Sequence, residues 1–273
     1  MNPPEHAADP GLTGLPETPT SPANPASPVA AEIAPRSSPR AVMLAAGAGL
    51  LAGLASWLVG EFTVTAFRPP LRPVTAMGVT MMLPTLEDEM ASDTRNAALA
   101  YGVLGGFVAS AMGLAGGWLG GSTVRGLRAS GIGAMLGTAA GAIASFLMVG
   151  LYFARHDTGE GDQNLLLPLV CHGGIWGTIG AVGGLSFGLG LGGRGKAAQA
   201  MLGGFLGGCA GAGLYEVAGA ALLPFARTVQ PIATSPFARL LAHLAVAILV
   251  GLLAASAVGE RRRGVKQPAI ARA

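Results

Sequence analysis

Residues 129–154 read ASGIGAMLGTAAGAIASFLMVGLYFA and contain no Asp, Glu, Lys or Arg. A helix of this length extends for about 39 Å at about 1.5 Å per residue, whereas the hydrocarbon core of a bilayer is about 30 Å thick. A helix on the surface of a soluble protein carries a polar stripe, which this stretch lacks. The stretch therefore predicts a transmembrane helix.

Five further apolar runs of similar length surround it. The chain of 273 residues is 51% hydrophobic and only 11% charged, which is too apolar for an ordinary soluble domain. We predict an all-α fold, a polytopic bundle of six spans in the cell (inner) membrane, with the lipid bilayer as its partner. The predicted spans are 41–60, 97–119, 129–154, 165–192, 198–223 and 240–259.

The two ends of the chain differ from the apolar region 41–259. Residues 1–40 hold 10 of the 19 prolines and cannot bury enough apolar surface to offset the entropy of ordering, which predicts a disordered tail. Residues 260–273 form a basic tail. Eleven of the 17 Lys and Arg lie in these tails and in the 120–128 and 193–197 turns, and six lie on the other side. The positive-inside rule therefore predicts that both termini are cytoplasmic and that the 61–96 loop is outside.

Glycines indicate how the spans pack. Of the 44 glycines, 34 lie between residues 97 and 223, often four residues apart, as in Gly133, Gly137 and Gly141. Small residues at this spacing let two helix backbones approach closely in lipid, so we predict glycine-zipper packing. Residues 96–150 align with 168–222 without gaps with ten identities in 55. A helical-hairpin repeat is thus a hypothesis, in which the sixth and first spans would form a split third hairpin.

Several functional classes find no support in the sequence. Cys171 and Cys209 stand in no CxxC spacing, so they indicate neither a disulfide framework nor a zinc site. The basic residues form no patch with aromatic residues between them, so we expect no nucleic-acid partner. We find no Ser/His/Asp or Cys/His arrangement. We therefore assign no catalytic, cofactor-binding or metal-ligating residue and expect a protein that is not an enzyme.

Ionisable residues inside spans are costly, and by default they mark a candidate functional site. His172, Glu216 and His243 each lie seven or eight residues from the outer end of a span, so we predict that they share one layer about 10 Å deep. Arg239 precedes His243 by four residues and could hold Glu216 ionised or compete with it. The three residues could form a structural polar network, a proton or solute pathway, or a metal site, and their spacing in sequence leaves all three open.

Tyrosines lie near the outer ends of the second, third and fifth predicted spans, at Tyr101, Tyr152 and Tyr215. Tyr is enriched at the level of the lipid headgroups, so we predict an aromatic belt there. The nearby acidic residues Glu87, Asp88, Glu89 and Asp93 could bind a cation weakly but are expected to form a solvated loop face.

The run Leu169-Val-Cys-His-Gly-Gly-Ile-Trp176, the glycines of 188–193 and 202–208, and Leu214-Tyr-Glu216 resemble sequences of Gly-rich, six-span bacterial membrane proteins of no known activity. The resemblance covers residues 41–255 and implies the six-span fold but no activity. From the polar residues we hypothesise small-solute or proton-coupled transport centred on Glu216. The alternative is a structural or assembly protein of the membrane whose N-terminal tail recruits a cytoplasmic partner.

Overall fold

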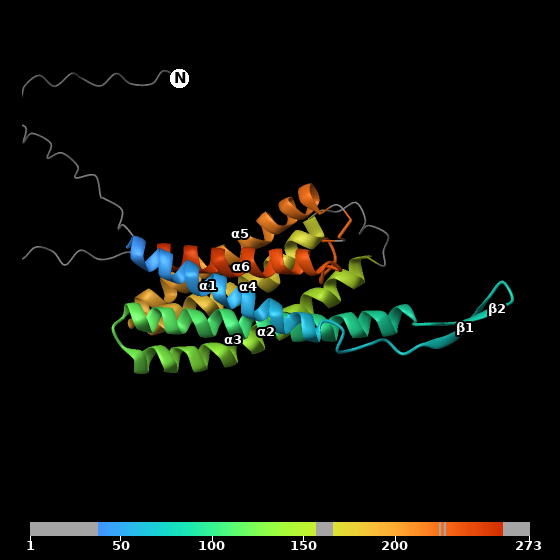
Figure 1. Cartoon of the computed structure of the whole chain (residues 1–273), viewed down its shortest axis with the longest axis horizontal. Coiled ribbons are helices and arrows are strands. Elements are labelled where there is room, and N and C mark those ends of the chain that lie inside the picture. The colour runs from blue at the N-terminus through green and yellow to red at the C-terminus, as the bar shows by residue number, and fades with distance from the viewer. Residues whose placement is uncertain (1–37, 157–165, 224, 227, 259–273) are drawn as a thin grey trace, which may run out of the picture. The chain divides into compact units, whose positions relative to one another are not determined.

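The computed structural model describes residues 38–156, 166–223, 225–226 and 228–258, which contain six long helices and one β-hairpin (Figure 1). All six helices are long and apolar enough to cross a membrane, which confirms the predicted six-span bundle. The predicted tails lie outside the described residues, apart from residues 38–40, where the first helix begins. The helices are α1 (Pro39–Thr63), α2 (Leu86–Leu119), α3 (Thr123–His156), α4 (Leu166–Leu191), α5 (Arg194–Leu222) and α6 (Pro236–Ala257).

Helix α2 begins eleven residues before its predicted start. The hydroxyl of Thr85 caps the helix by accepting a hydrogen bond from the Asp88 backbone N–H at 3.2 Å. The carboxylates of residues 87–89 lie in the first turn, where they interact favourably with the helix dipole. These acidic residues therefore belong to a helix N-terminus, and the prediction that they form a loop face is wrong. At about 1.5 Å per residue, α2 extends for about 51 Å and so projects beyond a hydrocarbon core of about 30 Å.

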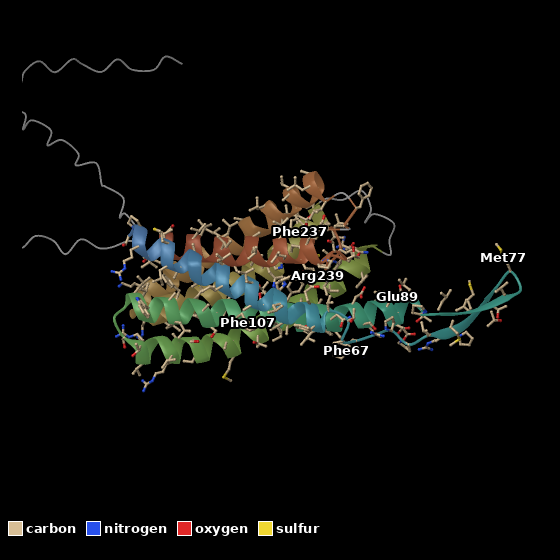
Figure 2. All side chains as sticks on the ribbon, in the orientation of Figure 1. Phe67, Met77, Glu89, Phe107, Phe237 and Arg239 are labelled. Atoms are coloured by element: carbon tan, nitrogen blue, oxygen red, sulfur yellow. The ribbon has the colours of Figure 1, made fainter. Side chains whose placement is uncertain are left out.

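The remainder of the predicted 61–96 loop contains two strands that we did not predict, β1 (Arg72–Ala76) and β2 (Val79–Leu83). They pair antiparallel through a two-residue turn in which Met77 and Gly78 both have positive φ, 53° and 78°, as tight hairpin turns require. Figure 2 shows Met77 at the tip of this hairpin. Arg72 donates to the Asp88 carboxylate at 2.8 Å and links the hairpin to α2.

The helices form an inner and an outer set. Half or more of each span is buried in α2, α4 and α6, but a third or less is buried in α1, α3 and α5. Large apolar side chains remain exposed on the outer set, among them Leu51, Leu58, Met135 and Phe146. Because a surface of this kind is compatible with lipid and not with water, the chain is a multi-pass membrane protein.

Each inner helix packs antiparallel against one outer helix at a contact that tolerates almost no side chain. A Cβ added to Gly105 of α2 would overlap the backbone of Gly137 of α3, and vice versa. Gly180 of α4 and Gly204 of α5 stand in the same relation. In the third pair, Gly49 of α1 meets the backbone of Ala247 of α6. The glycine spacing therefore corresponds to close backbone contact in all three pairs.

These three pairs share one register. The contacts recur one helical turn away, between Tyr101 and Gly141, between Trp176 and Gly208, and between His243 and Gly53. Counted from the turns, Gly117 meets Gly126 in the first hairpin and Gly188 meets Ala197 in the second, so both helices correspond at an offset of 71 residues. The ungapped alignment at an offset of 72 therefore differs by one residue from the correspondence of the contacts, since two residues connect α4 to α5 and three connect α2 to α3. The α1–α6 pair has the place expected of a split third hairpin.

Candidate functional site

His172 of α4 and Glu216 of α5 form a pair inside the bundle. His172 Nδ1 lies 2.5 Å from Glu216 Oε1, and the two side chains are only 2% and 17% exposed. The imidazole stacks on the indole of Trp176 at 4.8 Å and meets the Tyr215 ring edge-on at 5.5 Å. The stacked rings fix the plane of the imidazole, so that Nδ1 faces the carboxylate.

His243, the third predicted member of the cluster, has a different partner. Its Nδ1 lies 2.8 Å from the Ser56 hydroxyl of α1. That hydroxyl donates to the carbonyl of Gly53 at 3.0 Å, so it accepts the proton of His243 Nδ1. The structure therefore pairs His172 with Glu216 and places His243 in a separate hydrogen bond.

A second buried ion pair joins α6 to α1, and the sequence analysis did not identify it. Arg239 donates through Nε and through one terminal nitrogen to the two oxygens of Glu61, both at 2.7 Å. Its other terminal nitrogen donates to the carbonyls of Ala233 at 2.8 Å and Thr234 at 3.0 Å. The interpretation that Arg239 holds Glu216 is thus wrong, because its partner is Glu61. The sequence did contain a signal for this pair, because Glu61 and Arg239 are oppositely charged and lie near the outer ends of the first and last spans.

The two ion pairs occupy equivalent positions in the register of helix pairs. His172 lies one turn and Glu216 two turns beyond the contact of Trp176 with Gly208. Arg239 and Glu61 lie one to two turns beyond the contact of His243 with Gly53, at the same step in the register. At the offset of 71 residues, the corresponding residues of the α2–α3 pair are Tyr101 and Ser145, both buried. Two helix pairs thus carry an imidazole or a guanidinium and a carboxylate where the third carries a tyrosine and a serine.

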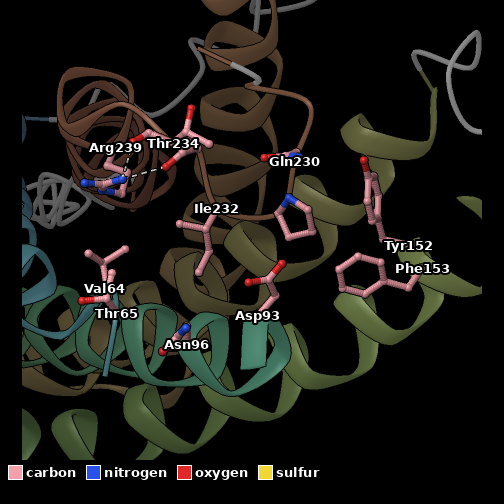
Figure 3. A pocket seen from close by; sticks show the side chains of 12 residues that line it. Val64, Thr65, Asp93, Asn96, Tyr152, Phe153, Gln230, Ile232, Thr234 and Arg239 are labelled. Atoms are coloured by element: carbon pink, nitrogen blue, oxygen red, sulfur yellow. Dashed lines mark hydrogen bonds between the residues drawn. The ribbon is translucent and has the colours of Figure 1, made fainter. Parts of the chain in front are cut away.

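Two cavities lie beside these pairs, and Figure 3 shows the wider of the two. The wide cavity has a volume of about 460 Å³, and Asp93, Tyr152 and Gln230 are among its lining residues. The small cavity, about 20 Å³, is lined by Tyr101, Trp176, Tyr215 and His243 among others, and has room for about one water molecule. Ile232, Ala233 and Arg239 line both cavities, so they form the wall between them.

This wall is held in place by hydrogen bonds to the connection between α5 and α6. The Tyr101 hydroxyl donates to the carbonyl of Pro231. Arg239 donates to the carbonyls of Ala233 and Thr234. The connection 231–234 is therefore attached both to α2 and to the Arg239–Glu61 pair.

Beyond the small cavity, toward the α2–α3 turn, the bundle axis is closed by apolar side chains. Leu104, Ile179 and Val246 are fully buried there. A methyl group on Gly183 would lie 3.0 Å from Val108 and 3.3 Å from Val250, so these inner helices converge on the axis. The two cavities thus lie on one side of a continuous apolar layer.

The predicted aromatic belt is wrong. Tyr101, Tyr152 and Tyr215 are 6%, 7% and 2% exposed, so they lie inside the bundle and not at its lipid-facing surface. Tyr101 and Tyr215 also contact Trp176, with ring centroids 6.4 Å and 5.2 Å apart. The Trp176 indole N–H is buried and has no hydrogen-bond partner within the part of the chain that the structure describes.

Among the described residues, no group of three or more His, Cys, Asp or Glu side chains is close enough to hold a metal ion. The arrangement can share a proton between an imidazole and a carboxylate, and it can admit a small molecule to the wide cavity. Comparison with protein families, curated proteins and solved structures gave no match to the sequence. The resemblance to Gly-rich bacterial membrane proteins therefore stays a prediction.

Proposed function

We propose that the protein is a membrane transporter that couples the passage of a small solute to protonation of the His172–Glu216 pair. The observation that carries this proposal is the pair itself, a carboxylate and an imidazole at 2.5 Å inside a membrane bundle. Ionisable groups are rarely retained in such a place without a role in a pathway. Because imidazole and carboxylate can exchange one proton at small energetic cost, the pair is suited to binding and releasing protons.

The cavities support the same proposal. The wide cavity is large enough for a small solute, and the small cavity lies behind the wall formed by Ile232, Ala233 and Arg239. The aromatic rings of Trp176 and Tyr215 connect the small cavity to His172. With the axis closed on the other side, this arrangement corresponds to one state of an alternating-access cycle in which the cavities are the accessible side.

The test is electrophysiology of proteoliposomes on a solid-supported membrane, with a panel of amines, amino acids, carboxylates and sugars applied under a pH gradient. We expect at least one solute class to give a transient current that depends on the pH gradient. The current should fall at least tenfold in Glu216→Gln, which preserves the size of the side chain but not its charge.

Glu87→Gln is the matched control, because it removes the same charge from an exposed position in the first turn of α2. It should carry the wild-type current. A wild-type current in Glu216→Gln, or no current for any solute beyond that of empty liposomes, would contradict the proposal. The assembly hypothesis, which depends on residues 1–40, would then be the one to pursue.

A further inference from the structure

The wide cavity is lined by the carboxylate of a solvent-exposed residue of α2. Asp93 lines it, and no hydrogen bond or ion pair to the Asp93 side chain is formed by residues 38–156, 166–223, 225–226 and 228–258. Figure 3 shows the Asp93 carboxylate between Asn96 and the ring of Phe153. We propose that this cavity binds an organic cation, an ammonium group carried on an apolar body, with Asp93 as its counter-ion.

The charge of the other lining residues favours a cation. Arg239 also lines the cavity, but its guanidinium is paired with Glu61 through two hydrogen bonds and donates its remaining bonds to Ala233 and Thr234. Asn96 is occupied too, because its amide accepts from the backbone N–H of Phe67 at 3.0 Å and donates to the carbonyl of the same residue at 2.9 Å. Asp93 is thus the uncompensated charge of the described lining, and an anion would be repelled by it.

The walls favour an apolar body on the ligand. Tyr152 and Phe153 form an edge-to-face pair with centroids 5.6 Å apart, and Val64 and Ile232 also line the cavity. Aromatic rings near a carboxylate attract ammonium groups through their negative faces, in addition to contributing apolar contact. The volume of about 460 Å³ lies in the usual range for small-molecule sites. A sugar would leave these apolar walls without partners.

Two sources can supply this chemistry. The cavity lies at the ends of α1 and α3 and beside the part of α2 that projects beyond the hydrocarbon core, which places it at the level of the lipid headgroups. The ammonium can therefore belong to a free amine or to the headgroup of phosphatidylethanolamine. If the organic cation is the solute that the protein transports, the inference rests on the function proposed above. Binding of the organic cation to the cavity is tested without transport.

The experiment is calorimetric titration of the full chain in nanodiscs of phosphatidylglycerol, which has no amine, with 2-phenylethylammonium as the probe. We expect saturable binding that is weakened about tenfold in Asp93→Asn and changed less than twofold in Glu87→Gln, an exposed carboxylate on the same helix. The neutral analogue 2-phenylethanol should bind at least tenfold more weakly than the amine. Equal thermal midpoints of the three proteins will show that each is folded.

Nanodiscs that also contain phosphatidylethanolamine distinguish the sources. A weaker apparent affinity for the probe in these nanodiscs identifies the lipid headgroup as the occupant, whereas an unchanged affinity identifies a free amine. Both outcomes support the organic-cation site. Wild-type affinity in Asp93→Asn, or equal binding of 2-phenylethanol, would overturn it. Transport of another solute class without amine binding would refute this inference alone, whereas amine binding without any transport current would refute the proposed function alone.

Discussion

The contact of α2 with α3 at Gly113 permits a quantitative prediction. A methyl group on Gly113 would lie 2.5 Å from the backbone nitrogen of Ser130 and 2.7 Å from the carbonyl carbon of Ala129. Non-bonded carbon atoms are in contact at about 3.5 Å, so Gly113→Ala should force the helices apart by about 0.8 Å. The same crossing holds a hydrogen bond of 2.7 Å between the hydroxyls of Ser110 and Ser130, which that displacement would stretch to the limit of a hydrogen bond.

The cost follows from these distances. Overpacking of a well-packed contact costs about 1–3 kcal/mol, and loss of an interhelical hydrogen bond in a membrane adds about 0.6 kcal/mol. The better helix propensity of Ala returns about 1 kcal/mol, which leaves a net loss of about 1–2 kcal/mol. For a chain of this size, we expect the thermal midpoint to fall by about 3–6 °C.

The assay is thermal unfolding of the purified protein in detergent, followed by the loss of the monodisperse peak in size-exclusion chromatography. Gly131→Ala is the matched control, because a methyl group at Gly131 of α3 would meet no atom within 4 Å. Its midpoint should equal or exceed that of the wild type. If Gly113→Ala melts at or above the wild-type midpoint, or if the two variants melt alike, the glycine contacts do not determine how closely the helices pack.

Two further predictions concern the wall between the cavities. Arg239→Gln should lower the free energy of unfolding by about 3 kcal/mol, because it leaves the largely buried Glu61 carboxylate without its partner. Arg72→Gln should lower it by under about 1 kcal/mol, because Arg72 is 62% exposed. Equal losses for the two variants in chemical denaturation would contradict this reasoning. Tyr101→Phe removes the donor to the Pro231 carbonyl and should cost about 1 kcal/mol. Amide exchange in residues 228–235 should then quicken while exchange in α3 does not, and unchanged exchange in both would mean that the hydroxyl does not hold the wall.

The helices could be predicted because a transmembrane segment is recognised from the hydropathy of one continuous stretch of sequence. An uninterrupted apolar run longer than the hydrocarbon core has few alternatives to a spanning helix, so residues 129–154 were sufficient to place α3. The glycine spacing similarly indicated close packing, since a four-residue period puts small residues on one helix face. The start of α2 at Leu86 was missed because eight of its first eleven residues are polar. Hydropathy does not detect the part of a helix that continues into water.

The polar site was only partly predictable, because its pairings depend on contacts between distant segments. Sequence alone marked His172, Glu216 and His243 as costly residues at a similar depth. The partners of these residues depended on tertiary structure, since the rotation of each helix about its axis is fixed by packing against its neighbours. That packing brings Glu216 to His172, Ser56 to His243 and Glu61 to Arg239.

The sequence by itself thus determined that the chain is a six-helix membrane protein, because hydrophobic length is a local property. Only the tertiary structure decided which helix contacts of the first two helix pairs correspond, since backbone contacts at glycine leave almost no signal in side-chain identity. It also decided which carboxylate faces which base and where the cavities lie. These features arise where helices from both ends of the chain meet, and no single stretch of sequence contains them.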